Sequence, residues 1–116
     1  MNNKYDVIIV GAGPAGIFTA IELIKNKSDK KILIIEKGKP VDKRKCPKTK
    51  TGKCINCKPN CMITTGFSGA GAFSDGKLSL SCDVGGDLPN LIGKEEAQDL
   101  INYTDSIYLD FLKIFL

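Results

Sequence analysis

The order of apolar runs in the first 36 residues predicts a strand, a helix and a second strand. Val7–Val10 is a continuous β-branched run, typical of a strand buried on both faces of a parallel sheet. Apolar residues then recur at i, i+3, i+4 and i+7, as in a helix that packs one stripe against a sheet. These residues are Ile17, Ala20, Ile21 and Ile24. After a polar break at 25–31, KILIIEKG predicts a second buried strand ending at Glu36, paired in parallel with the first.

Beyond Gly38 this pattern is lost for nearly thirty residues, where prolines and lysines oppose regular structure. A glycine-punctuated segment follows, and the alternation over 77–82 predicts a short strand. Glu95 and Glu96 mark the first turn of a helix that runs towards the C-terminus, with a potential break near Asn102. The prediction is an α/β fold.

The chain ends in the apolar stretch YLDFLKIFL, without a capping residue. One interpretation is a helix whose packing partners are missing, which would make residues 1–116 the N-terminal part of a larger, here incomplete, domain. The other is a terminal helix docked on the core. A chain of 116 residues holds at most one modest domain in either case.

The turn between the first strand and the helix reads GAGPAG and fits the pattern G-x-G-x-x-G. Gly11 would make the tight turn, Gly13 would let the backbone approach a pyrophosphate, and Gly16 would allow close contact between helix and strand. Pro14 suits a first helical turn, whose N–H groups would bind the phosphates. Glu36 follows Gly16 by twenty residues at the end of the next strand, where an acid accepts hydrogen bonds from the adenosine ribose and repels a 2′-phosphate.

These features predict a Rossmann-like dinucleotide-binding domain. The run DVIIVGAGPAG followed by ILIIEKG, at the very start of the chain, resembles the FAD-binding half of the two-dinucleotide-binding-domain flavoproteins. With GFSGAGAFSDGKL and the preceding cysteine loop, it is similar to the bacterial FAD-dependent dehydrogenases or NAD(P)/FAD-dependent oxidoreductases. The resemblance covers nearly all of residues 4–111.

The resemblance implies two groups of FAD contacts. The pyrophosphate would be held by Gly11, Ala12, Gly13, Pro14, Ala15 and Gly16, and the ribose by Glu36 with Lys37 beside the adenosine. The second glycine-rich segment would line the cofactor near the flavin through Ser68, Gly69, Ala70, Gly71, Ala72 and Phe73, with Asp75 and Lys77 as polar neighbours. Small residues permit close backbone approach, and successive N–H groups can form an anion-binding nest. The alternative is a glycine-rich hairpin without a ligand.

Residues 37–65 form a basic, cysteine-rich insertion. Between Lys37 and Lys58 there are nine basic residues against Asp42, whereas the rest of the chain has eight basic and twelve acidic residues. Such a loop is usually solvated, but it can attract phosphates or offset thiolate charge. It contains no aromatic residue for base stacking, which argues against a nucleic-acid partner.

Four cysteines in this insertion have the spacing C-x7-C-x2-C-x3-C, and the chain has no histidine. Cys46, Cys54, Cys57 and Cys61 are candidate ligands for an all-cysteine zinc site or an iron–sulfur cluster. Alternatively, Cys54 and Cys57 form a redox dithiol that exchanges electrons with the flavin, or the thiols share no role. Cys82 lies outside this spacing and is expected to be buried.

The function expected from the resemblance is an FAD-dependent oxidoreductase, a dehydrogenase, with NAD(P)H as a candidate reductant and a small-molecule substrate or electron acceptor as partner. The alternatives are an NAD-binding dehydrogenase domain that uses the same turn and Glu36, and a non-enzymatic module that binds metal or nucleic acid. No apolar run is long enough for a membrane span or a secretory signal, which leads to the expectation of a cytoplasmic protein. This short chain alone is expected to be a poor catalyst, because the strands that complete the sheet and cover FAD would lie beyond it.

Overall fold

The structure, a computed structural model, describes residues 4–26 and 29–113. The chain forms two compact units, with the boundary between Asp75 and Gly76. The extreme ends of the chain and part of the predicted polar break lie outside the described residues, including the last three residues of the apolar tail.

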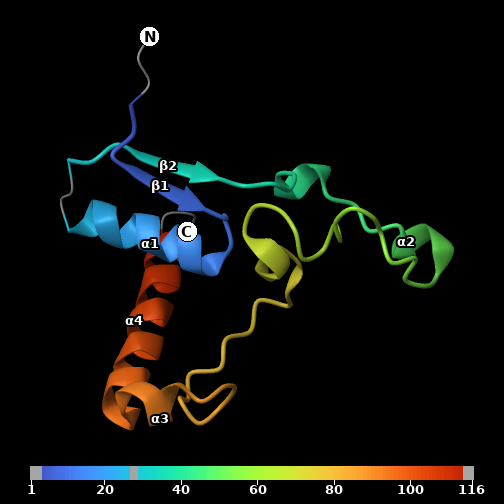
Figure 1. The fold of residues 1–116 in the computed structure, drawn as a ribbon. Coiled ribbons are helices and arrows are strands. Elements are labelled where there is room, and N and C mark those ends of the chain that lie inside the picture. The colour runs from blue at the N-terminus through green and yellow to red at the C-terminus, as the bar shows by residue number, and fades with distance from the viewer. Residues whose placement is uncertain (1–3, 27–28, 114–116) are drawn as a thin grey trace. The chain divides into compact units, whose positions relative to one another are not determined.

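The first unit begins with the predicted strand, helix and strand (Figure 1). Strand β1 is Val7–Val10, helix α1 is Pro14–Lys25 and strand β2 is Ile32–Ile35. The two strands are parallel, in a register that pairs Val7 with Ile32 and Val10 with Ile35. The Gly11 N–H donates to the Ile35 carbonyl at 2.7 Å, so the pairing continues into the glycine turn. These observations confirm the predicted β-α-β unit, although β2 ends one residue before Glu36.

The prediction that these strands are buried on both faces was wrong for this chain. Residues alternate across β1, so Val7 and Ile9 point to one face of the sheet and Ile8 and Val10 to the other. Ile8 is 58% exposed and Val10 is 84% exposed. The described residues form a sheet of only two strands. The face that carries Ile8 and Val10 is exposed because no other described element covers it.

The stretch after β2 contains short helical segments that proline and lysine content did not predict. They are the 3-10 helix η1 (Val41–Lys43), the four-residue helix α2 (Lys48–Thr51) and the 3-10 helix η2 (Gly69–Phe73). A parallel bridge between Lys39 and Gly66 closes this stretch back onto the end of β2. The insertion is therefore a loop whose two ends are joined beside the glycine turn.

The second unit contains helix α3 (Leu88–Ile92) and helix α4 (Lys94–Leu112), which pack on each other. Gly93, with φ +92°, separates the two helices. The break predicted near Asn102 is absent from α4, where the Gln98 side-chain amide donates to Asn102 Oδ1 at 3.0 Å across one turn. Ala97 and Ile107 form the buried side of this helix. No described helix is long and apolar enough to span a membrane.

The short strand predicted over 77–82 does not form in the described chain. Instead, Gln98 of α4 takes the place of a strand partner: its amide donates to the Leu80 carbonyl at 2.9 Å, and its Oε1 accepts from the Cys82 N–H at 3.1 Å. The bond to Gln98 places Cys82 beside α4. Cys82 is 6% exposed, which confirms the expectation that it is buried. The segment is thus an extended stretch bound by a side chain.

Candidate functional site

The glycine turn between β1 and α1 has the geometry that its sequence predicts. Gly11 has φ +103°, a conformation in which a side chain is strained. A Cβ placed on Gly16 would overlap the Gly11 carbonyl oxygen and lie 3.2 Å from Ile9 Cγ2. A Cβ on Gly13 would have no neighbour within 4 Å among the described atoms. The turn therefore packs tightly at its first and last glycines and leaves the middle one open to an approaching group.

The open side of this turn is the start of α1. Gly13 caps the helix without a side-chain hydrogen bond to it, and Pro14 occupies the first turn. N–H groups in a first helical turn have no carbonyl partner within the helix, and the helix dipole adds partial positive charge there. The turn thus provides donors and a favourable field for an anion, and Gly13 and Ala15 expose the backbone to it.

Glu36 lies at this turn and is held by two backbone donors. The Ala12 N–H donates to its Oε2 at 2.8 Å, and the Gly38 N–H donates to its Oε1 at 2.7 Å. These two bonds, with a smaller contribution from Lys37, hold the pKa of the Glu36 carboxyl below its ordinary value of 4.5. Each carboxylate oxygen can accept a further hydrogen bond, so the side chain is fixed and still able to receive two hydroxyls.

The second glycine-rich segment lies directly against the first glycine turn, although more than fifty residues separate the two in the sequence. The Ser68 N–H donates to the Ala12 carbonyl at 2.7 Å. A Cβ placed on Gly69 would lie 3.8 Å from Pro14 Cδ and 3.9 Å from Gly13 Cα. The structure therefore brings together both glycine-rich segments and Glu36, the groups that the sequence proposed for a single site.

Ala12 connects these groups and is 1% exposed. Its N–H donates to Glu36 and its carbonyl accepts from Ser68, so both of its backbone groups are used within the protein. A phosphate contact from the Ala12 N–H would require the Glu36 bond to be exchanged. The N–H groups of Gly13 and Ala15 are not the ones that donate to Glu36, so a phosphate contact there would leave the Glu36 bonds in place.

The remaining proposed contacts lie in two places. Lys37 is exposed beside Glu36. The helical segment η2 contains Gly69, Ala70, Gly71, Ala72 and Phe73, and it begins after Ser68, which has φ +66°. Asp75 ends the first unit, whereas Lys77 belongs to the second.

Arg44 is a buried residue beside the candidate site that the sequence did not single out, because it was counted with the solvated basic loop. It is 3% exposed. Its guanidinium donates to the carbonyls of Phe67 at 2.6 Å, Gly69 at 3.0 Å and Ile63 at 3.4 Å. It also lies 4.7 Å from the centre of the Phe73 ring. One signal was available in the sequence: Arg44 is the only arginine among seventeen basic residues, and arginine suits buried multidentate contacts better than lysine does.

The predicted metal site is not formed in this structure. Cys46, Cys54, Cys57 and Cys61 are all free thiols, and no three of the described cysteine, aspartate and glutamate side chains are placed to hold one ion. A four-cysteine zinc or iron–sulfur site needs all four sulfurs around one centre, and sequence spacing alone did not produce that arrangement. Cys54 and Cys57, the candidate redox dithiol, are not joined by a disulfide in this structure.

Cys61 differs from the other cysteines in its surroundings. Hydrogen bonds from the backbone N–H groups of Thr64 and Ile63, and from the Thr64 side chain, hold the pKa of the exposed Cys61 thiol below its ordinary value of 9.0. A lowered pKa increases the thiolate fraction at neutral pH, and the thiolate is the reactive form.

We therefore expect Cys61 to be the first cysteine alkylated by limiting iodoacetamide at pH 7. Peptide mass spectrometry would measure the order, with exposed Cys54 as the comparison and buried Cys82 reacting last. Thr64→Val should slow labelling at Cys61 by severalfold without changing Cys54. Equal rates at Cys61 and Cys54 would contradict this account.

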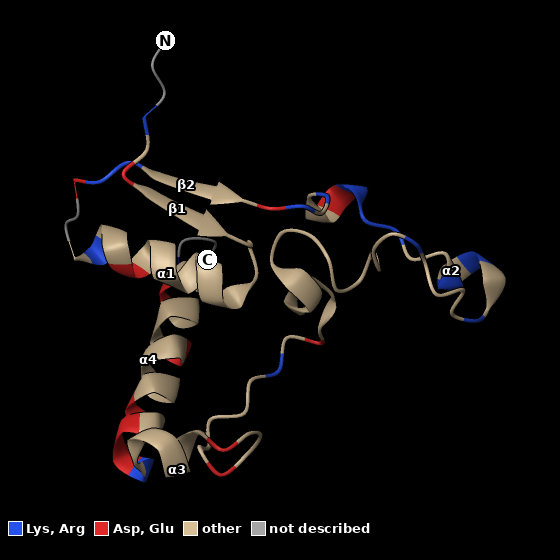
Figure 2. Cartoon of the chain, viewed as in Figure 1, with Lys and Arg blue, Asp and Glu red and all other residues tan. Residues whose placement is uncertain are grey.

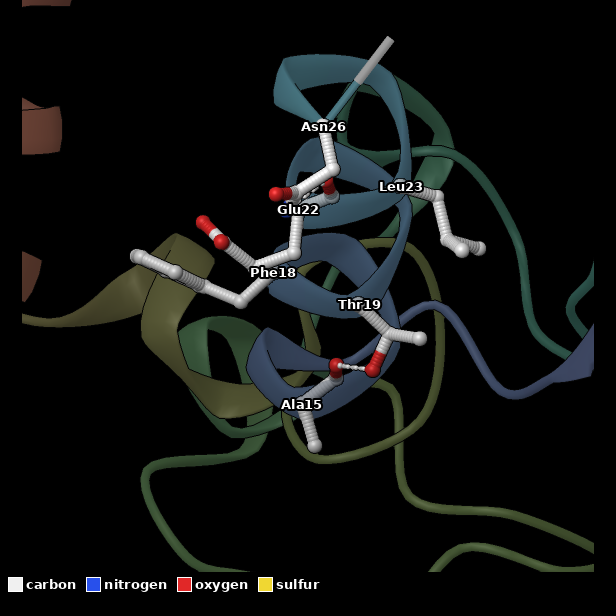
Figure 3. A pocket seen from close by; sticks show the side chains of 6 residues that line it. All are labelled: Ala15, Phe18, Thr19, Glu22, Leu23 and Asn26. Carbon is white, nitrogen blue, oxygen red and sulfur yellow. Dashed lines mark hydrogen bonds between the residues drawn. The ribbon is translucent and has the colours of Figure 1, made fainter. Parts of the chain in front are cut away.

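A groove of ≈ 460 Å³ lies along one face of α1 (Figure 3). It is lined by Ala15, Phe18, Thr19, Glu22, Leu23 and Asn26. The Thr19 hydroxyl donates to the Ala15 carbonyl, and the Asn26 amide donates to the Glu22 carbonyl, so both polar side chains bond to their own helix. The groove includes neither Glu36 nor the second glycine-rich segment, and we do not assign it to the anion site.

The basic residues of the insertion lie in η1, in α2 and in the loops on either side of them (Figure 2). With Arg44 buried, the exposed basic residues from Lys37 to Lys58 are all lysines. In the second unit, the charged residues of α4 are mostly acidic.

Comparisons with known proteins agree with this geometry. Residues 5–99 match the family described as pyridine nucleotide-disulphide oxidoreductase. An uncharacterized protein of Clostridium beijerinckii is 42% identical over 72 residues, which cover 62% of the chain and 13% of that protein. No solved structure matches the chain. The family has a Rossmann-like domain that binds FAD or NAD(P), and the parallel β1-α1-β2 unit is a part of such a domain. The chain therefore belongs to the pyridine nucleotide-disulphide oxidoreductase family.

Proposed function

We propose that this chain supplies the ADP-binding part of the FAD site of an FAD-dependent oxidoreductase. The observation that carries the proposal is the carboxylate of Glu36, which two backbone N–H groups fix at the mouth of the glycine turn. A carboxylate held in this way is ready to accept the two ribose hydroxyls of an adenosine whose phosphates lie at the start of α1. The pyrophosphate would bind at Gly13, Ala15 and Gly16.

The residues of the site fit a dinucleotide in two further respects. The open space beside Gly13 admits a group at van der Waals distance from the backbone. The second glycine-rich segment lies next to the same glycine turn and offers small residues, from Ser68 to Ala72, on which a flat cofactor could rest. When bound, FAD would supply the hydride or electron-pair chemistry, while the protein would bind it, orient it and exclude water.

NAD is the second candidate, because the family binds FAD or NAD(P) and both cofactors share the ADP moiety. The position of the second glycine-rich segment favours FAD, since by resemblance this segment approaches the flavin. The non-enzymatic metal-binding alternative loses its main support, because the described cysteines do not form a metal site.

Glu36→Gln tests the proposal. The neutral amide loses the charge-assisted hydrogen bonds to ribose, and its NH₂ group would face either the Ala12 N–H or the Gly38 N–H. A hydrogen bond to a charged group is stronger than one between neutral groups, so we expect ADP to bind about 10- to 100-fold more weakly. Amide NMR titration or calorimetry would measure the affinity. Asp29→Asn is the matched control, because its carboxylate is 92% exposed and distant in sequence from the turn.

Two further measurements sharpen this test. The wild-type chain should prefer 5′-AMP to 2′,5′-ADP, which differs by a 2′-phosphate, and Glu36→Gln should reduce that preference. Because the pKa of Glu36 is lowered, its bonds to Ala12 and Gly38 should persist above the ordinary pKa of 4.5 and be lost as pH falls through the lower folded value. The stability difference between wild type and Glu36→Gln should therefore be present at pH 7 and disappear in strong acid. A wild-type chain that binds neither ADP nor FAD would refute the proposed function.

A further inference from the structure

Arg44 is a buried cation whose side-chain hydrogen bonds, among the described residues, all go to the segment 63–69. Its three carbonyl acceptors belong to Ile63, Phe67 and Gly69, and the ring under its guanidinium belongs to Phe73. No ion pair joins Arg44 to a carboxylate of the described residues. The guanidinium therefore makes a multidentate contact with backbone dipoles, for which its planar set of donors is suited and a lysine ammonium is not.

The segment that Arg44 holds is also the segment that meets the glycine turn. Arg44 donates to the carbonyls of Phe67 and Gly69. Between these two residues, the Ser68 N–H donates to the Ala12 carbonyl. On the other side, the Phe67 N–H donates to the Lys39 carbonyl at 3.3 Å. Removing Arg44 would leave residues 67–69 attached through the Ser68 bond to Ala12 and the Phe67 bond to Lys39, with the half-buried carbonyls of Phe67 and Gly69 deprived of this donor.

The packing around Arg44 is tight on the side of Gly66. A Cβ on Gly66 would lie 2.6 Å from Arg44 Cδ and 2.9 Å from its Nε. The Nε is buried and has no hydrogen-bond acceptor among the described residues. An unpaired buried donor lowers stability, and this one belongs to a side chain whose other donors fix the backbone of the second glycine-rich segment.

We propose that Arg44 is a positioning residue of the cofactor site: it fixes residues 67–69 against the glycine turn, and through them it sets the affinity for the diphosphate of a bound nucleotide. This inference rests on the proposed function. Arg44 touches no ligand in this account. It acts by holding the backbone of Ser68 and Gly69 beside Gly13, where a phosphate would lie.

The test compares Arg44→Met with Lys45→Met in the whole chain. Both remove one positive charge, but Lys45 is exposed and makes none of these contacts. We expect Arg44→Met to weaken ADP binding about tenfold, to weaken adenosine binding by less than twofold, and to speed hydrogen exchange at the Ser68 amide. The amides of Val7 to Val10 should keep their exchange rates, and Lys45→Met should behave as wild type.

The split between ADP and adenosine separates positioning from general destabilisation, which would weaken both ligands and speed exchange throughout the first unit. Arg44→Lys should not restore ADP affinity, because charge alone does not satisfy three carbonyls. If Arg44→Met fails to fold, Phe73→Leu, which removes only the ring contact, should give a smaller shift in the same direction.

The outcomes are distinct. Unchanged ADP affinity and unchanged Ser68 exchange in Arg44→Met, with a wild-type chain that binds ADP, would overturn the positioning role and leave the proposed function intact. Full restoration by Arg44→Lys would also overturn it, because a field effect would then suffice. A wild-type chain that does not bind ADP would refute the proposed function. In that case, Ser68 exchange in Arg44→Met would still show whether Arg44 holds the segment: faster exchange would support this, and unchanged exchange would overturn it.

Discussion

Gly16→Ala is expected to disrupt the β1-α1 unit, although it adds one methyl group to a helix. The new Cβ would overlap the carbonyl oxygen of Gly11, which is backbone and cannot move without breaking the turn. Overpacking of this kind costs about 1–3 kcal/mol or more, a large fraction of the stability of a small domain. Amide exchange across β1 and thermal unfolding followed by circular dichroism would measure the loss.

Gly13→Ala is the matched comparison, because the same methyl group is added three residues earlier. Gly13 has φ −77°, and its Cβ would meet no atom within 4 Å. We expect this variant to keep the unfolding temperature of wild type and to lose ADP affinity by tenfold or more, since the methyl group occupies the space proposed for the pyrophosphate. Gly13→Ala with unchanged ADP affinity would place the phosphates elsewhere.

Gly66→Ala is expected to release the second glycine-rich segment from the glycine turn. Gly66 has φ +136°, a conformation that costs about 1–3 kcal/mol for other residues. Its Cβ would overlap the Lys39 carbonyl and press on Arg44 Cδ, so the bridge between Lys39 and Gly66 would be lost. Faster hydrogen exchange at Phe67 and Ser68, together with weaker ADP binding, would measure this release.

Gly52→Ala controls for backbone strain alone. Gly52 also has a positive φ, of +73°, but its Cβ would have no neighbour within 4 Å. This variant should lose some local stability at the end of α2 without affecting ADP binding or the Ser68 amide. Equal effects of the two substitutions would show that the contacts of Gly66 with Lys39 and Arg44 contribute nothing.

The cysteine insertion, residues 37–65, is anchored to the first unit mainly at its two ends. Its ends are tied together by the Lys39 to Gly66 bridge and by Arg44, whereas α2 and its four cysteines lie between these anchors. Changes in residues 46–58 should therefore affect nucleotide binding little. This arrangement also explains why a basic loop with several prolines can be inserted so close to a glycine turn without disturbing it.

Local sequence determined the β-α-β unit and the glycine turn. Apolar periodicity predicts β1, α1 and β2 because each element needs only its own residues and one neighbour. The roles of Gly11 and Gly16 also follow from sequence, since a tight turn between strand and helix admits little else. The position of Glu36 beside the glycine turn was predictable because it follows the second strand at a defined distance, although its two backbone partners were not.

Only the tertiary structure decided the features that depend on residues far apart in the chain. Spacing alone predicted a four-cysteine metal site and a strand over 77–82, but the cysteines are separated and Gln98 takes the place of a strand partner. Arg44 looked like one of nine basic residues in a loop, and its burial depends on carbonyls about twenty residues later. Local propensity and turn chemistry are carried by adjacent residues, whereas burial and side-chain partners depend on which distant segments the fold brings together.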